Sequence, residues 1–543
     1  MIRLKDLDHN IFYLFGLVVL VIGLPWSPFL ISLSQAILLT NWILEGDLIF
    51  KFKMLLKRKG ALLFISIFLF HILGTLYSTD VPMAFKDIKI KLPLFIFPLV
   101  MATTKTLSLK QLKIILYAFL VAFFISSLLS VLALLGLTNH EINDIRDISL
   151  FISHIRFALL INIGIFSASF LLFIANSRTC LKSIILWVFL IWFTAFLFIL
   201  QSLTGIIVFI ITTGFLLIRW SFLRKNKFYK YAGLIIAILI PLVIVAYITV
   251  SVKKYYTIDK VNIEKLDTHT KAGNKYLHKP GSKAIENGHF VWLYVCYPEL
   301  EQEWNKRSKI KYHETDKKGH QIKLTLIRFL TSKGYRKDAE GIARLSNEEI
   351  EYIENGIANY IFINKFGFYP RIYQSIWEIE QYKNGKNPSG HSLTQRIEYY
   401  KSAYGIFRQN VLFGVGTGDV KAAFDEYYKD SNSRLKKKWR LRAHNQFMTF
   451  LVTFGIVGLF WIVFSFTMSI YREQGFKNYL FTFFFFIAFL SMINEDTLET
   501  QAGATFFAYF YCLFLFAYKS NGQFDFFKEI NNKKDIPKNE LHI

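Results

Sequence analysis

Residues Arg434 to Gly458 read RLKKKWRLRAHNQFMTFLVTFGIVG, a strongly basic segment joined directly to a long apolar one. Six Lys or Arg lie within the nine residues from Arg434 to Arg442, and His444 and Asn445 stand at the junction. Such a junction is typical of a membrane edge, where basic side chains contact headgroups and an apolar helix enters the bilayer. It indicates either a charged membrane flank or a site that holds an anionic lipid headgroup and acts on it.

The composition of the chain indicates a polytopic integral membrane protein. Hydrophobic residues make up 53% of its 543 residues, and apolar runs of about 20 residues, the length that crosses a bilayer, recur along it. Because helices satisfy their backbone hydrogen bonds internally, the predicted fold class is all-α. We expect about twelve transmembrane helices, over residues 10–25, 28–45, 60–77, 92–104, 113–136, 154–176, 183–200, 203–219, 231–250, 444–471, 478–493 and 502–518.

The distribution of Lys and Arg over the loops predicts the orientation of the chain. A net charge of +25 would suggest a nucleic-acid partner for a soluble protein, but here the charges concentrate in alternate loops. The other loops are neutral, mixed or acidic, as in the loop that carries Glu141, Asp144 and Asp147. The positive-inside rule then places both termini in the cytoplasm and residues 251–443 on the opposite face. We expect membrane lipids as partners and no nucleic acid.

Four parts follow from this assignment: spans one to nine in 1–250, a large outer loop in 251–443, spans ten to twelve in 444–519, and a cytoplasmic tail in 520–543. Residues 251–323 show little periodicity, whereas helical signals dominate after them. Two capping-box patterns, Ser346-Asn-Glu-Glu349 and Ser392-Leu-Thr-Gln395, predict helix starts. The loop is therefore expected to be mostly helical. Three cysteines are too few and too scattered for a disulfide framework.

The first candidate functional residues lie at the junction. His444 is expected to begin the tenth span, with Asn445, Arg440 and Arg442 beside it on the outer face. Ionisable groups at a membrane edge are costly unless they pair or act. Two interpretations stay open: an interfacial histidine that caps the helix or lies among headgroups, and a histidine that takes part in chemistry.

Other polar residues on the outer face also allow two interpretations each. Arg396 lies near a predicted helix N-terminus, where an anion is favoured, but it is equally an ordinary surface arginine. Gly414-Val-Gly-Thr-Gly418 resembles a phosphate cradle only weakly, and a sharp turn is the favoured interpretation. His154 and Arg156, at the outer end of the sixth span, either face the site or snorkel to the interface. Three carboxylates before the last span either bind a metal or act in acid–base chemistry, or simply mark an outer loop: Glu495, Asp496 and Glu499.

Two segments then carry a resemblance to a known family. QRIEYYKSAYGIFRQNVLFGVGTGD (395–419) and RAHNQFMTFLVTFGIVGL (442–459) resemble the O-antigen ligase family, as does the arrangement of about a dozen spans with one large loop before the tenth. The resemblance implies a GT-C-like glycosyltransferase of the bacterial inner membrane. Such an enzyme moves a glycan from undecaprenyl diphosphate to an acceptor hydroxyl, such as that of lipid A core, on the periplasmic face. O-antigen polymerases and protein O-oligosaccharyltransferases belong to the same superfamily and remain alternatives.

The resemblance also implies roles for particular residues. His444, with Asn445, occupies the position of the catalytic His-Asn pair, and Arg396 matches an arginine that contacts the donor diphosphate. Many relatives have Ser-Arg-Gly near the start of the eighth span, whereas this chain has Gln201-Ser-Leu-Thr-Gly205 without an arginine. Arg156 or Arg442 is the expected replacement. Further candidate substrate contacts are Arg440, His154 and Gly416.

The implied reaction needs no cofactor and no metal. His444 would take the proton of the acceptor hydroxyl, and arginines would neutralise the leaving diphosphate, so a single displacement inverts the anomeric centre. The first outer loop, Pro25-Trp-Ser-Pro28, lacks the carboxylates that other membrane glycosyltransferases use. From other classes, a polysaccharide transporter or flippase would predict inverted repeats, which are not evident. A membrane anchor for a binding module would not need twelve spans.

Overall fold

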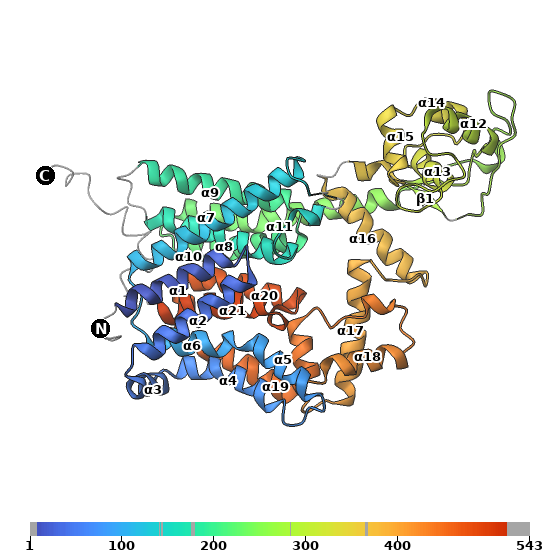
Figure 1. Ribbon diagram of the computed structural model, residues 1–543. Helices are drawn as coiled ribbons and strands as arrows, with labels where there is room; N and C mark the ends of the chain where they lie inside the picture. The colour runs from blue at the N-terminus through green and yellow to red at the C-terminus, as the bar shows by residue number, and fades with distance from the viewer. Residues whose placement is uncertain are drawn as a thin grey trace. The chain divides into compact units, whose positions relative to one another are not determined.

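The computed structural model describes residues 8–140, 142, 145–174, 180–282, 284–363 and 367–518 (Figure 1). Helices dominate this part of the chain, and its two named strands, β1 (Ile285–Glu286) and β2 (His289–Phe290), form one small antiparallel pair. The all-α prediction is therefore confirmed. The expected tail, 520–543, lies outside the described residues, as do Glu141 and Asp144.

Contacts along the chain define two compact units. Unit 1 comprises Met1–Ile238 and Asn387–Ile543, and unit 2 comprises Leu239–Lys386. Residues 387–443, which the sequence assigned to the outer loop, thus group with the apolar helices. Unit 1 contains α1 (His9–Gly23), α2 (Pro28–Leu44), α3 (Leu48–Lys57), α4 (Lys59–Leu73), α5 (Val81–Lys91), α6 (Pro93–Thr103), α7 (Leu109–Leu134), α8 (His154–Ile174), α9 (Cys180–Ile199), α10 (Leu203–Phe222), the start of α11 (Lys227–Tyr256), α17 (Ser392–Gln409), α18 (Val420–Asp430), α19 (Gln446–Arg472), α20 (Tyr479–Asn494) and α21 (Gln501–Cys512).

Each of the twelve predicted spans falls on a helix, but the helices differ in length. Six of those described are long and apolar enough to cross a membrane, namely α7 to α11 and α19, and the pair α2–α3, bent by 110°, is a seventh candidate. Helices such as α4 and α20 are apolar but shorter, and at 1.5 Å per residue they fall below a full bilayer crossing. The protein is therefore a multi-pass membrane protein, and six or seven of its described helices are candidate full-length spans where the sequence indicated about twelve transmembrane helices.

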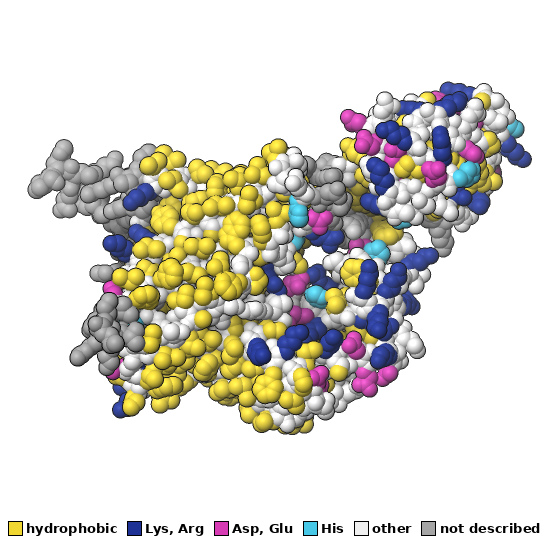
Figure 2. All heavy atoms as spheres, viewed as in Figure 1, with side chains coloured by type: hydrophobic (Ala, Val, Ile, Leu, Met, Phe, Trp, Pro, Cys, Tyr) yellow, Lys and Arg dark blue, Asp and Glu magenta, His cyan; other side chains and the backbone are white. Residues whose placement is uncertain are grey.

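The apolar side chains of unit 1 cover its helices on the side shown in Figure 2. Several large hydrophobic residues of unit 1 are strongly exposed, among them Phe29, Ile49, Phe228 and Phe460, each at least 70% exposed. Such an exposed apolar surface is unfavourable in water and suits a hydrocarbon environment. The surface therefore supports membrane insertion independently of helix length.

Contacts between the loops of unit 1 follow the predicted alternation of sides. On the expected cytoplasmic side, Arg58 Nη2 lies 3.4 Å from Glu473 Oε2. On the opposite side, the rings of Trp26 and Phe151 pack with their centroids 4.9 Å apart. In both cases the contacting loops are ones that the distribution of Lys and Arg assigned to the same face.

Unit 2 is a small helical body with its own core. Beyond the end of α11 it contains the β1–β2 pair, α12 (Tyr297–Arg307), α13 (Ile322–Ser332), α14 (Ala339–Ala343), α15 (Asn347–Glu354) and α16 (Phe368–Lys383). Trp304, Leu326 and Ile353 are fully buried in its core. Residues 251–323, which lack periodicity in sequence, thus contribute both a helix and core side chains.

The two capping-box predictions had different outcomes. Ser346 and Glu349 form the reciprocal capping hydrogen bonds at the start of α15, as predicted. The second prediction is wrong, because His391 rather than Ser392 is the N-cap of α17 and no side chain caps that helix. The helix nevertheless begins where the pattern indicated, and it places Arg396 in its second turn.

Candidate functional site

His444 lies in a turn directly before α19 rather than inside the helix. Its backbone is left-handed, with φ 49°, a conformation that is uncommon outside glycine and more often tolerated by His, Asn and Asp. Asn445 is the N-cap, and its side chain accepts a hydrogen bond from the Met448 N–H (3.0 Å). The helix therefore begins at Gln446, two residues after the predicted start. The turn, and not a helical face, sets the direction of the imidazole.

Asp496, in the loop between α20 and α21, holds this turn in place. Its carboxylate accepts the backbone N–H groups of His444 and Asn445, each at 3.0 Å, and the Thr449 hydroxyl at 2.7 Å. Burial raises the pKa of Asp496 above its usual range, although these hydrogen bonds oppose the shift. Three donors on one carboxylate fix the peptide that carries His444.

Glu495 joins the two residues that the sequence singled out most strongly. Its Oε2 lies 3.4 Å from His444 Nδ1, and its Oε1 lies 3.3 Å from Arg396 Nη2. Tyr399, one turn after Arg396, stacks on the His444 ring with centroids 5.3 Å apart and planes 29° apart. A proton on Nδ1 can be donated to Glu495, which leaves Nε2 as the proton acceptor. The imidazole is thus oriented by a carboxylate and an aromatic ring.

These neighbours also change the acidity of His444. Burial disfavours the imidazolium ion, but the hydrogen bond to Glu495 and the charges of Glu495 and Asp496 outweigh it, so the pKa of His444 lies above its ordinary value. The positive charge of Arg396 lowers the pKa of His444 and so opposes this increase. A histidine with a raised pKa is a stronger base when it is neutral, which suits proton abstraction from a hydroxyl.

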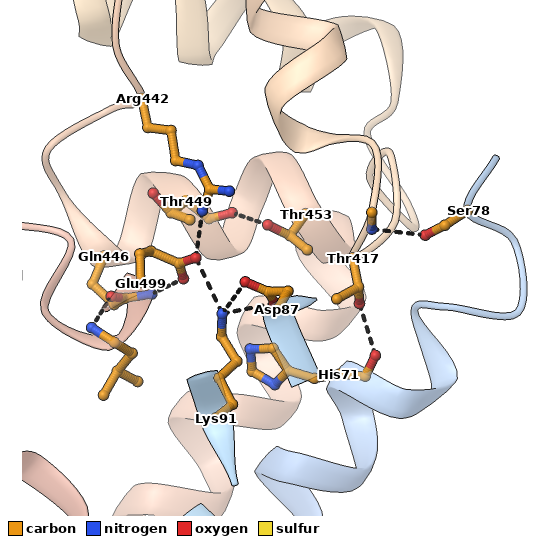
Figure 3. Close-up of polar contacts among 12 residues, drawn as sticks. His71, Ser78, Asp87, Lys91, Thr417, Arg442, Gln446, Thr449, Thr453 and Glu499 are labelled. Carbon is orange, nitrogen blue, oxygen red and sulfur yellow. Dashed lines mark hydrogen bonds and ion pairs between the residues drawn. The ribbon is translucent and has the colours of Figure 1, made fainter. Parts of the chain in front are cut away.

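Arg442 belongs to a buried network of charges that Figure 3 shows beside α19. Arg442 and Lys91 both form ion pairs with Glu499, and Lys91 Nζ lies 3.1 Å from Glu499 Oε2. Lys91 also pairs with both oxygens of Asp87 at 2.7 Å, and Gln446 Nε2 donates to Glu499 at 3.1 Å. Burial alone would raise the pKa of Glu499, but Lys91 and Arg442 hold it well below its usual range. The network fixes Arg442 two residues before His444.

Arg156, at the start of α8, also lies at the 495–500 loop. Its guanidinium donates to the Thr500 hydroxyl, and a cavity of about 110 Å³, otherwise lined mainly by apolar side chains, borders Arg156, Glu495 and Asp496. The start of α10 lies beside the end of α20, directly before this loop, because Asn494 Nδ2 donates to Thr204 Oγ1 (2.5 Å). Arg156 and the start of α10 therefore both contact the segment 494–500.

The glycine turn serves the packing of α19. Gly414 and Gly416 have φ values of 67° and 93°, and the Gly416 N–H donates to Thr453 O (2.9 Å). Gly455 has φ 63° within α19, where a Cβ atom would lie 2.3 Å from Leu412 O. The turn thus fills a break in the helix. This geometry confirms the sharp-turn interpretation, and the Gly416 amide is already used within the protein.

Two other candidate substrate contacts have different surroundings. Arg440 Nε donates to Leu435 O (3.1 Å), and its guanidinium lies over the Tyr428 ring, so it closes the 431–443 loop. His154 is the first residue of α8, two positions before Arg156. As substrate contacts, both stay predictions.

Sequence reasoning missed the residues that join the site together. Glu495, Asp496 and Glu499 were weighed as metal ligands, as acid–base groups or as an ordinary outer loop, and in the structure each pairs with a cation or holds a backbone turn. Among the described residues, no group of three or more His, Cys, Asp or Glu is arranged to hold a metal ion. Lys91 and Asp87 were not singled out at all. Their spacing of four residues on one helix was the available signal.

The fold and the site together define a multi-pass membrane protein with a site in which arginine, lysine and histidine side chains pair with carboxylates from several segments. Residues 356–463 match the family described as O-Antigen ligase. The chain thus contains an O-antigen ligase family domain, as the resemblance implied. The match covers part of the chain and indicates an enzyme of the O-antigen ligase or polymerase type. No curated protein matches the chain.

Removing the charge of Lys91 tests the buried network. Lys91 is 1% exposed and pairs with two carboxylates, and breaking a buried ion pair typically costs about 3–5 kcal/mol. Lys91→Met is therefore expected to lower the free energy of unfolding by about that amount, measured by denaturation of the purified protein in detergent. The exposed Lys89 on the same helix provides the control. An equal effect of Lys91→Met and Lys89→Met would contradict the role given to the network.

Proposed function

We propose that the protein is an O-antigen ligase-like glycosyltransferase. It would transfer a polysaccharide or oligosaccharide from undecaprenyl diphosphate to an acceptor hydroxyl, with lipid A core as the favoured acceptor. The observation that carries this proposal is the bridging carboxylate of Glu495, which contacts His444 on one oxygen and Arg396 on the other. A candidate base and a candidate phosphate ligand, 48 positions apart in sequence, therefore meet at one point.

In the proposed reaction, the acceptor hydroxyl oxygen attacks the anomeric carbon of the donor glycan. Its proton passes to Nε2 of His444. The Nδ1 atom keeps its own proton and donates it in a hydrogen bond to the Glu495 carboxylate. The bond between the anomeric carbon and the diphosphate oxygen breaks, and its electron pair leaves with undecaprenyl diphosphate. This division of labour resembles the histidine–carboxylate pairs of other enzymes, in which the carboxylate orients the ring and stabilises the imidazolium ion. One displacement inverts the anomeric centre.

Arginines would balance the charge that develops on the leaving diphosphate. Arg396 and Arg156 are the leading candidates to bind the diphosphate of the glycan donor, since guanidinium groups bind phosphate oxygens bidentately. Arg442 is paired with Glu499, so its contribution would be a fixed positive field near His444 rather than a free ligand. We propose a metal-independent reaction because Arg396 and His444 share the Glu495 carboxylate and because the first outer loop carries no carboxylate.

The proposed location is the periplasmic face of the bacterial inner membrane. The site combines α5, the starts of α8 and α10, residues 396–445 and the 495–500 loop, all of which the distribution of Lys and Arg assigned to the outer side. Short helices such as α4 would still join the two faces, giving twelve passes with both termini in the cytoplasm. This arrangement would place donor and acceptor in the same compartment.

Changing Glu495 tests the coupling between the carboxylate and the base. Only a neutral His444 can accept the proton, so transfer should rise with pH through the pKa of His444. Glu495→Gln removes the interactions that raise this pKa. The acidic limb of the profile of kcat/KM against pH should therefore move to lower pH, with a lower plateau. Glu426→Gln, on the exposed face of α18, is the control. An unmoved limb would contradict the pairing.

A deletion strain identifies the acceptor. If the protein is a ligase, loss of the gene should remove long glycan chains from lipid A core while the lipid-linked donor accumulates. A polymerase would leave single repeat units attached, and a protein O-oligosaccharyltransferase would instead change the glycoprotein profile. The wild-type gene should restore the profile and the His444→Ala gene should not. Unchanged lipopolysaccharide and glycoprotein profiles would contradict the proposal.

A further inference from the structure

Unit 2 contains a cavity that the transfer reaction does not use. Its volume is about 610 Å³, within the range of about 300–1,000 Å³ typical of small-molecule sites. The end of α11, the β1–β2 segment, α13 and α16 line it. Much of this lining comes from residues before position 356, outside the segment that matches the family.

Aromatic rings form a large part of the wall. Tyr255 and Tyr256 come from α11, Trp292 follows β2, and Tyr373 and Trp377 come from α16. The rings of Tyr255 and Tyr373 pack edge to face with centroids 4.7 Å apart, which holds this part of the wall in position. Flat rings at the edge of a polar cavity suit the C–H faces of pyranose sugars.

Polar groups in the wall are fixed by mutual hydrogen bonds. Glu286, which is 6% exposed, accepts from Arg328 Nε (2.6 Å) and Asn359 Nδ2 (2.8 Å). Glu380 accepts from the Tyr255 hydroxyl at 2.7 Å. Carboxylate, guanidinium and hydroxyl groups held in this way can both donate to and accept from sugar hydroxyls without first losing side-chain freedom.

The charges of the lining select among ligand classes. Two carboxylates, Glu286 and Glu380, face one guanidinium, Arg328, and one imidazole, His320. A phosphate or nucleotide would meet as many acidic as basic groups, and an acyl chain would cover charged side chains with hydrocarbon. A neutral sugar has no charge to be repelled and offers hydroxyl groups to the polar side chains, so its chemistry fits this lining best.

We propose that unit 2 binds a neutral oligosaccharide in this cavity, as a glycan-binding site separate from the transfer site. Neutral pyranose residues of the lipid-linked donor and of the acceptor are the two sources of this chemistry. The inference concerns binding by unit 2 alone and does not require the transfer reaction.

Isothermal titration of the full-length protein in detergent tests the proposal. The probes are glycan released from undecaprenyl diphosphate by mild acid and core oligosaccharide released from lipopolysaccharide, with ATP as the anionic comparison. At least one glycan should bind with a Kd below about 1 mM, and the glycan that binds identifies the source. Binding of ATP alone, or of neither glycan, would overturn the proposal.

Variants separate this cavity from other surfaces. Tyr256→Ala and Trp377→Ala should each weaken glycan binding at least tenfold. The control is Tyr297→Ala, which should leave binding unchanged because Tyr297 is an exposed residue of unit 2 outside the cavity. If Trp377→Ala does not fold, Gln381→Ala, in the same wall, replaces it. Equal binding by the cavity variants and wild type would refute the site. His444→Ala should bind glycan normally, so failure of transfer and failure of this inference are distinguishable.

Discussion

Replacing His444 with alanine is expected to lower the rate of glycan transfer by about 10²- to 10⁴-fold, the usual contribution of a general base. The imidazole is oriented by Glu495 and Tyr399, and water would have to replace it as the proton acceptor. The loss should appear in kcat, with little change in the donor KM, because His444 acts on the acceptor proton. The rate of lipid diphosphate release by purified protein measures it.

The control for this variant is His140→Ala, since His140 is exposed in a loop of the same unit. Both variants should unfold at the same temperature as the wild type. Full activity in His444→Ala would show that another group takes the proton. A matched loss in His140→Ala would show that the assay reports folding instead of chemistry.

Replacing Arg396 with alanine is expected to impair donor use most strongly. A hydrogen bond to a charged group contributes about 1.5–3 kcal/mol, which corresponds to roughly a 10- to 150-fold decrease in kcat/KM for the lipid-linked donor. Arg396→Lys should recover only part of this loss, because an ammonium group keeps the charge but lacks the planar fork of the guanidinium. Initial rates at varied donor concentration give both parameters.

Arg408, near the end of the same helix, is exposed and supplies the matched control. Arg408→Ala should leave donor kinetics unchanged, so a general effect of altering α17 would be visible. Normal donor turnover by Arg396→Ala would remove Arg396 from the diphosphate site. The ion pair with Glu495 would then be its only role in the structure.

The helices could be predicted because membrane insertion imposes a local pattern on the sequence. The apolar runs and the loops that separate them predicted the position of every helix assigned as a span. The Ser346–Glu349 pattern correctly predicted the start of α15. Helix lengths were less predictable, since an apolar flank such as residues 74–77 extends a hydrophobic run without being helical. Ser392 failed as a cap although its pattern matched, because the helix already includes Ser392 and His391 occupies the N-cap position.

The site could be predicted only in part. His444 and Arg396 were singled out by charge, position and family resemblance, but their meeting at Glu495 spans 51 and 99 positions of sequence. The left-handed turn at His444 also has no local signature, since Asp496 stabilises it from another loop. Contacts of this kind depend on how the helices pack, which single-sequence patterns do not encode.

The most direct test of the account is a transfer assay with purified full-length protein, undecaprenyl diphosphate-linked glycan and lipid A core, followed by mass spectrometry. We predict that the wild type forms glycan joined to the acceptor and releases one undecaprenyl diphosphate per transfer, and that His444→Ala and Arg396→Ala are each strongly impaired. An intact donor after incubation with the purified wild type, or equal product from His444→Ala, would contradict the central claim that the residues bridged by Glu495 perform glycan transfer.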